Sequence, residues 1–335
     1  KAWNAVFVGD PCKHPYLKAA PGRLWVYDPP DGKPRPTFRF LPDFTAPDQL
    51  VTNAMGWRGP PLTLDKPARV VRIGFLGAST TVNSHFYPYS YPEFVVGWLN
   101  LWAAAHRKDV RFEVLNTGRE GINSVDIEAI TRTELLPFRP DIVVYYEGAN
   151  QFALHTLLEK PPTSGPARPA EIPPESGLSR WLREASNRSA IARRVQVGLG
   201  MLRHTDNGGE WKKPPYRIVW PQGLSEEEPD IVRPDLPVNL SRILADLDRI
   251  RQELEGVGGQ LVLSSYKWMV YDGMVADPVF NRSLIEHLNV GEFPFSYRDI
   301  ARVAAFQNRV FARYAASRGL PFIDVASEMP NRPDL

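Results

Sequence analysis

The sequence predicts an α/β protein with a doubly wound, flavodoxin-like parallel sheet of about five strands, in a three-layer α/β/α arrangement. From residue 69 onward, short apolar segments alternate with longer segments that have helical spacing. The short segments are apolar on both faces, as parallel strands covered by helices on both sides are. We therefore expect one α/β domain over residues 69–335. A Pro- and aromatic-rich extension (residues 1–68) should pack on it, and an insertion at about 156–236 should interrupt it.

The first half of this domain contains three strand segments and two helical segments. The strand segments are residues 70–77, 111–118 and 140–150, and the helical segments are residues 91–107 and 123–138. Asn123 and Ser124 are N-cap candidates for the second helix, and Asp126 lies in its first turn. Upstream, the stretch VTNAMGWRGPP (51–61) reads as a turn whose Trp and Arg pack against a larger body.

The alternation resumes after the insertion. Helical segments 238–259 and 296–319 are followed by strand segments 260–266 and 321–327, respectively. Ser296, with Asp299 three residues later, is typical of a helix start. Inside the insertion, residues 178–202 have helical spacing and an Arg-rich face, which suits a helix packed on the main body or lying at a surface.

Composition and charge describe an ordinary globular protein. Of 335 residues, 43% are hydrophobic and 23% are charged, and the net charge of +2 gives no electrostatic reason to expect nucleic-acid binding. Cys12 is the only cysteine, so no intramolecular disulfide can form. The first residues lack the pattern of a signal peptide, and the chain begins without Met. We interpret it as a mature or trimmed chain and expect a periplasmic or membrane-anchored protein that faces outside the cytoplasm.

Small and polar residues follow three of the predicted strands directly. Ser79 follows the first strand, Gly121 lies in NTGREG (116–121) after the second, and Asn150 follows the third. The carboxyl ends of parallel strands share one edge of the sheet, where open α/β sheets bind their ligands. A serine nucleophile with converging N–H donors is what an acyl-transfer site needs, because preplaced donors must hold the oxyanion formed on attack.

These three blocks resemble those of the SGNH (GDSL-like) hydrolase family. The matching blocks are Gly77-Ala78-Ser79, Gly121, and Gly148-Ala149-Asn150. The resemblance covers about residues 69–152 and, more loosely, 238–327. It implies that Ser79 is the nucleophile and that the Ser79 and Gly121 backbone N–H groups form an oxyanion hole with the Asn150 amide. Ala78 stands where the strict motif has Asp, at a position without a catalytic role in the family.

The resemblance also implies a D-x-x-H motif after the last strand, with the His as base and the Asp orienting it. No such motif follows the last strand segment here, since Asp324 is followed three residues later by Ser327. We expect the catalytic His and Asp beyond Leu335. We interpret His85 and His155, which lie near the first and third blocks in the sequence, as cleft or surface residues.

Each candidate also has a structural interpretation. Ser79 could be a helix N-cap, Gly121 could permit a tight turn as we expect of Gly118, and Asn150 could cap the next helix. Asn116 could hold the loops by hydrogen bonds. For Arg58, a structural salt bridge is a better explanation than a place at the mouth of the cleft.

No cofactor or metal is predicted. His14, His106, His204 and His287 have no metal-ligand spacing with other His, Asp or Glu residues. The sequence GASTT lacks the last Gly of a G-x-S-x-G elbow, and neither a P-loop nor a dinucleotide fingerprint occurs.

The combined pattern predicts a serine esterase or acyl transferase that acts on a carboxylic ester through an acyl-serine intermediate. The substrate would be a small-molecule or glycan ester, for instance an acetylated sugar, because Trp and Tyr in the flanks could stack on a glycan. The alternative is a non-catalytic SGNH-like binding or assembly subunit of a larger complex, such as one associated with a membrane. In that case the extension 1–68 and the insertion 156–236 would contact a protein or membrane partner.

Overall fold

The computed structural model describes residues 49–83, 89–160, 211–268 and 282–330, together with 17–19, 25–27 and some isolated positions. Most of the predicted helix 178–202 lies outside the described residues. The chain forms two compact units. The first comprises Lys1–Phe152, Glu228–Tyr266 and Asn308–Val325, and the second comprises Ala153–Glu227, Lys267–Gln307 and Ala326–Leu335.

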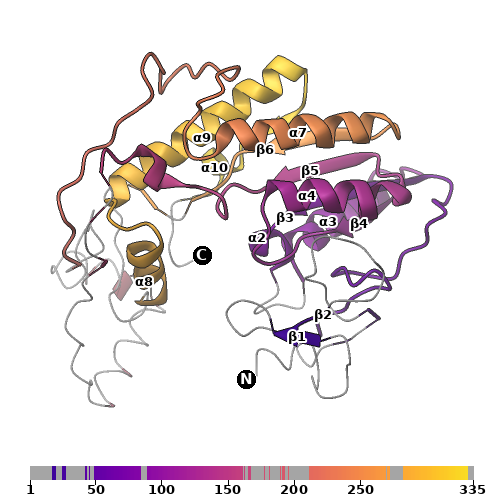
Figure 1. The fold of residues 1–335 in the computed structure, drawn as a ribbon. Helices are drawn as coiled ribbons and strands as arrows, with labels where there is room; N and C mark the ends of the chain where they lie inside the picture. The colour runs from indigo at the N-terminus through magenta and orange to yellow at the C-terminus, as the bar shows by residue number, and fades with distance from the viewer. Residues whose placement is uncertain are drawn as a thin grey trace. The chain divides into compact units, whose positions relative to one another are not determined.

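A five-stranded sheet in the order β4-β3-β5-β6-β7 forms the centre of the first unit (Figure 1). Its strands are β3 (Val70–Gly77), β4 (Arg111–Asn116), β5 (Ile142–Tyr146), β6 (Gln260–Ser264) and β7 (Phe322–Ile323). Every neighbouring pair is parallel, which confirms the predicted doubly wound sheet. Because β3 lies between β4 and β5, the loops that follow these three strands emerge next to one another.

Helices cover both faces of this sheet and make the three predicted layers. They include α3 (Tyr91–Ala105), α4 (Ser124–Ile130), α7 (Leu240–Glu255) and α9 (Tyr297–Arg318). On one face, Val96 of α3 packs with Ile73 and Val114. On the opposite face, the ring of Phe311 in α9 meets Tyr145 edge to face, with centroids 6.4 Å apart. Successive residues of a strand point to opposite faces, so both helix layers draw on the same apolar strands.

The predicted helix starts are confirmed. The Asn123 side chain accepts the backbone N–H groups of Val125 (3.0 Å) and Asp126 (3.4 Å), and the Asp126 carboxylate accepts the Asn123 N–H in return. Ser296 accepts the Asp299 N–H at 3.3 Å at the start of α9. These side chains satisfy N–H groups that have no partner within the first turn of a helix.

The segment predicted as one helix over 123–138 changes geometry along its length. After α4, Thr131–Leu135 form a π-helical turn and Leu136–Phe138 a 3₁₀ turn. Thr131 and Thr133 donate their hydroxyls to carbonyls four residues back, at 2.8 and 2.7 Å, and Pro137 has no N–H to continue an α-helix. Both features disturb the regular ladder of backbone hydrogen bonds.

The last predicted strand, 321–327, is mostly not a strand. β7 contains 2 residues, and Val325–Glu328 form a short helix, α10. Pairing with β6 ends at Ile323, and the next side chain, Asp324, accepts the hydroxyl of Ser265 at 2.7 Å. Among the described residues, elements without a counterpart in the prediction include the pair β1 (Leu17–Ala19) and β2 (Trp25–Tyr27), the 3₁₀ turn Leu154–Leu157, and helix α8 (Arg282–Gly291).

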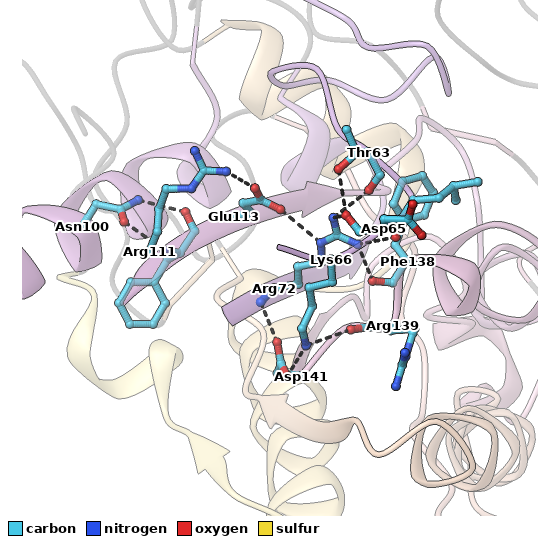
Figure 2. A network of polar contacts seen from close by, with 12 residues as sticks. Thr63, Asp65, Lys66, Arg72, Asn100, Arg111, Glu113, Phe138, Arg139 and Asp141 are labelled. Atoms are coloured by element: carbon cyan, nitrogen blue, oxygen red, sulfur yellow. Dashed lines mark hydrogen bonds and ion pairs between the residues drawn. The ribbon is translucent and has the colours of Figure 1, made fainter. Parts of the chain in front are cut away.

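Arg72, inside β3, joins the stretch 63–65 to the sheet (Figure 2). Its guanidinium is fully buried and donates to Glu113 and to the carbonyls of Thr63, Leu64, Asp65 and Phe138. These five acceptors match the five N–H groups of an arginine side chain. Residues 63–65 are therefore fixed to the sheet by a side chain of β3.

The second unit has its own polar and aromatic contacts. Tyr216 donates its hydroxyl to Asp299 and accepts the backbone N–H of Ser296 at 2.7 Å. The ring of Trp220 meets Phe306 edge to face, with centroids 4.9 Å apart. Across the described residues of both units, none of the helices combines the length and the apolar character needed to span a bilayer.

Candidate active site

The pairing of β3 with β5 places the first block (Gly77-Ala78-Ser79) and the third block (Gly148-Ala149-Asn150) next to each other at the carboxyl end of the sheet. Gly77, the last residue of β3, pairs with Tyr146, the last residue of β5. A Cβ atom at position 77 would lie 2.5 Å from the Tyr146 carbonyl oxygen and 2.0 Å from Oγ1 of Thr81. Only glycine allows this close approach. The two turns that follow, which carry Ser79 and Asn150, therefore leave neighbouring strands side by side.

Ser79 is the first residue of a short helix, α2 (Ser79–Val82), and is half-buried. Ala78 occupies the N-cap, and its carbonyl accepts the N–H groups of Thr81 (3.0 Å) and Val82 (3.1 Å). The N-cap interpretation of Ser79 is therefore wrong. Among the described residues, none forms a hydrogen bond with the Ser79 hydroxyl. The side chain is thus partly accessible and is not needed to hold the turn.

Glu147 links the Ser79 turn to the Asn150 turn. Its carboxylate is buried and accepts the backbone N–H groups of Ala149 and Asn150, both at 2.9 Å. It also accepts the N–H groups of Gly148 and, on the other turn, of Ala78. Burial raises the pKa of Glu147, and these N–H groups partly offset that effect by stabilising the carboxylate. Glu147 is not among the residues that the sequence motifs single out, although a lone carboxylate at the end of an apolar strand is a usable signal.

The Asn150 side chain faces the second block. Its Nδ2 donates to the carbonyl of Ile122 at 2.7 Å, directly after Gly121. An amide carries two N–H groups, so this bond orients the side chain and leaves a second donor. The neighbouring residue Gln151 accepts both the backbone N–H (3.2 Å) and the hydroxyl (3.1 Å) of Ser124. The structure therefore brings the Asn150 turn next to the loop that contains Gly121.

Gly121 is exposed and has a φ of 69°, in the left-handed region. A Cβ atom here would meet no other atom within 4 Å, so it is the backbone conformation, rather than space, that favours glycine. The same loop approaches the first block, because Arg119 donates its backbone N–H to the Gly77 carbonyl at 3.4 Å. Among the described residues, no acceptor takes the N–H of Gly121.

A buried ion pair between Arg119 and Glu134 fixes the loop that contains Gly121. Arg119 is 4% exposed and donates to Glu134, which is also buried. Glu134 also accepts the indole N–H of Trp57 at 3.2 Å. A buried carboxylate shared by a guanidinium and an indole fixes all three side chains, because each would otherwise leave a polar group without a partner.

Arg58 supports the helix that begins with Ser79. It is buried, its Nε pairs with Glu93 at 3.0 Å, and its Nη1 donates to the Val82 carbonyl at 2.9 Å and to that of Asn83. The structural salt bridge predicted for Arg58 is therefore confirmed. So is the expectation that the Trp and Arg of residues 51–61 pack against a larger body. Trp57 supports the loop of the second block through Glu134, and Arg58 supports the short helix of the first block through Val82.

Asn116 has the loop-holding role considered for it. Its Nδ2 donates to the Ser90 hydroxyl at 2.9 Å and to the Thr81 carbonyl at 3.4 Å, and its Oδ1 accepts the Gly118 N–H at 3.1 Å. The side chain is 1% exposed, so it does not reach a ligand. It joins the end of β4 to α2 and to the start of α3.

Three tyrosines pack at the same edge of the sheet. Tyr146 stacks on Tyr266 with ring centroids 5.0 Å apart and meets Tyr91 edge to face at 5.7 Å. Burial raises the pKa of Tyr91 and of Tyr266, so both phenols stay neutral. Tyr266 shares a hydrogen bond with the Thr80 side chain, next to Ser79. The Ser79 turn is therefore flanked by an aromatic cluster on one side.

The catalytic His and Asp that the resemblance implies lie outside the described residues. His85 lies outside the described residues, and His155 is an exposed residue of the 3₁₀ turn Leu154–Leu157 in the second unit. Asp324, at the end of β7, is engaged by the Ser265 hydroxyl. Within the described ranges, no group of three or more His, Cys, Asp and Glu side chains is placed to hold a metal ion.

No family model and no curated protein matches the chain. Solved structures similar to it include a lipase/acylhydrolase from Enterococcus faecalis (15% identity, 78% of this chain and 80% of that one, TM-score 0.37). A GDSL-like lipase from Bacteroides thetaiotaomicron is 11% identical over 82% of this chain and 77% of its own, with a TM-score of 0.35. An acetyl xylan esterase variant from Geobacillus stearothermophilus is 13% identical over 77% of each chain, with a TM-score of 0.37.

These solved structures are acylhydrolases and esterases, the class of enzyme that the sequence motifs resemble. Their TM-scores lie below 0.5 and their identities at or below 15%. The function proposed for this chain therefore rests on the residues at the carboxyl ends of β3, β4 and β5.

Proposed function

We propose that the protein is a serine ester hydrolase with Ser79 as its nucleophile. The observation that carries this proposal is the set of bonds among the three strand-end turns. Glu147 joins the Ala78 N–H to the Asn150 turn, and Asn150 joins that turn to Ile122, next to Gly121. A partly accessible serine hydroxyl and N–H donors from two other turns thus share one edge of the sheet. That combination suits attack on an ester carbonyl.

In the proposed reaction, the Ser79 oxygen bonds to the ester carbonyl carbon while the hydroxyl proton passes to a base. We expect this base to be the histidine that the family resemblance implies. The backbone N–H groups of Ser79 and Gly121 and the second N–H of Asn150 would stabilise the tetrahedral oxyanion. Collapse of this intermediate breaks the bond to the alcohol, which receives the proton. Water then hydrolyses the acyl-serine and releases the acid.

We further propose a small acyl group, such as acetyl on a sugar, as the substrate class. The aromatic cluster beside Ser79, whose rings could contact a sugar, motivates this choice. Comparison of p-nitrophenyl acetate with longer-chain esters, followed by acetylated xylan, tests it. A preference for long acyl chains would contradict it.

Intact-mass spectrometry after treatment with a fluorophosphonate probe tests the nucleophile. The full protein should gain one adduct, mapped to Ser79, and Ser79→Ala should gain none. Thr80→Ala, which alters the adjacent exposed hydroxyl, is the matched control and should still be labelled. A wild-type protein that gains no adduct, or gains one elsewhere, would contradict the hydrolase and favour a binding or assembly subunit.

A further inference from the structure

Helix α3 presents an apolar surface where a surface helix normally presents polar residues. Phe94, Val95, Trp98, Leu101 and Trp102 all point outward, and Trp98 is 70% and Leu101 61% exposed. Residues 94–105 contain no charged side chain. We name these five residues the α3 outer face.

The rotation of α3 about its axis is fixed by its inner side. Val96 packs into the sheet with Ile73 and Val114. Asn100 donates from Nδ2 to the Phe112 carbonyl at 3.0 Å and accepts the Phe112 N–H on Oδ1 at 2.9 Å. These bonds tie the helix to β4 in one orientation. The outer face therefore cannot turn inward without breaking them.

Helix α7 provides an internal comparison, because it also covers the sheet of the first unit. Its buried residues are largely apolar, whereas its exposed positions include Arg242, Arg249, Gln252 and Glu255. This is the ordinary pattern of an amphipathic helix on a protein surface. α3 has the same kind of buried side but lacks the polar outer side. A contiguous exposed apolar patch of this sort marks an interaction surface.

Two features favour a lipid surface over a protein as the partner. Trp98 and Trp102 lie one turn apart on the outer face, and tryptophan is enriched where proteins meet the interface between water and lipid. Directly after the helix, Arg107 and Lys108 are exposed, and neither forms an ion pair with a described residue. Exposed cations beside an apolar helix face complement the negative charge of anionic lipid headgroups.

We infer that the α3 outer face binds the surface of an anionic bilayer, with α3 lying in the plane of the interface. The aromatic and aliphatic side chains would enter the boundary between headgroups and acyl chains, while Arg107 and Lys108 remain at headgroup level. This mode needs no membrane-spanning helix. It is independent of the proposed esterase activity, and it would hold the first unit at a membrane.

Vesicle co-sedimentation of the full protein tests this inference. Wild type should sediment with vesicles of phosphatidylcholine and phosphatidylglycerol in a 7:3 ratio, roughly. The double variant Trp98→Ser/Trp102→Ser should bind about ten-fold more weakly or worse, because the apolar contribution is lost. Arg107→Glu/Lys108→Glu should lose about ten-fold in affinity for these vesicles but not for pure phosphatidylcholine. Val232→Ser, at an apolar residue that is 85% exposed elsewhere in the first unit, is the control and should bind as wild type does.

Three results would overturn the inference. One is absence of wild-type binding to the anionic vesicles. Another is unchanged binding by the tryptophan double variant, with circular dichroism showing that it is folded. The third is a wild-type dimer in light scattering that the tryptophan substitutions convert to a monomer without any vesicle binding, which would assign the α3 outer face to a second copy of the chain.

Discussion

The carboxylate of Glu147 accepts the backbone N–H of Asn150 at 2.9 Å, and the same carboxylate accepts the N–H of Ala78 on the neighbouring turn. One buried side chain therefore sets the separation between the turn that carries Ser79 and the turn that carries the Asn150 amide. Because a misplacement of about 1 Å can cost an enzyme about 100-fold in rate, such a bridge matters for the proposed chemistry.

Substitution of Glu147 by Gln should lower kcat for p-nitrophenyl acetate by about 100-fold and leave KM nearly unchanged. Gln offers one acceptor oxygen, and its NH₂ group would face the backbone N–H groups, so the turns should separate. Steady-state kinetics and the rate of fluorophosphonate labelling measure this effect. Glu255→Gln, at an exposed carboxylate of α7, is the control. Equal kinetics for Glu147→Gln and wild type would contradict a positioning role.

The same carboxylate should make stability depend on pH. Burial raises the folded-state pKa of Glu147 above its unfolded value, so the folded protein holds this proton more tightly. This group's contribution to the free energy of unfolding is therefore fully present at low pH and is lost as pH rises through the folded pKa. In urea unfolding, wild type should gain stability relative to Glu147→Gln as the pH is lowered from neutral toward the ordinary pKa of a glutamate. A constant difference between the two proteins would contradict the raised pKa.

Asn150→Ala should reduce kcat by about 100- to 1000-fold, the usual effect of losing one oxyanion donor. Asn150→Asp should be at least as damaging, because it replaces the N–H donor with a negative charge near the developing oxyanion. Thermal unfolding of both variants should stay close to wild type, since Asn150 is exposed. Full activity in Asn150→Ala would remove this residue from the oxyanion hole.

Arg58→Met should destabilise the fold by about 3–5 kcal/mol, because it leaves the Glu93 carboxylate and the Val82 carbonyl without their buried partner. Arg58→Lys should not restore stability, since one ammonium cannot replace the geometry of a guanidinium. Urea unfolding measures both variants. Arg242→Met, at an exposed position of α7, should change stability little. A loss in Arg58→Met no larger than in that control would mean that the buried pair contributes nothing to stability.

Much of the site could be predicted from the sequence because its residues follow strands directly. In a parallel sheet, residues after neighbouring strands meet at one edge, so Ser79, Gly121 and Asn150 could be grouped without coordinates. The structure places the three turns that carry them side by side. The support beneath them could not be predicted. Trp57 lies 77 positions from Glu134 in the sequence, and no local pattern links the two.

The alternation of apolar strands with helical segments by itself determined the parallel sheet, because short continuous apolar runs form buried strands and segments with a 3.6-residue period form helices. Tertiary structure decided where that alternation ends. The segment 321–327 is apolar enough for a strand, yet it pairs for 2 residues before Asp324 turns to Ser265. Tertiary structure also decided that Glu147 and Arg58 hold the Ser79 turn and that the α3 outer face stays exposed. A buried polar side chain forms its hydrogen bonds with the groups that lie near it in the folded chain. Which groups those are depends on tertiary packing, so the sequence pattern alone does not show them.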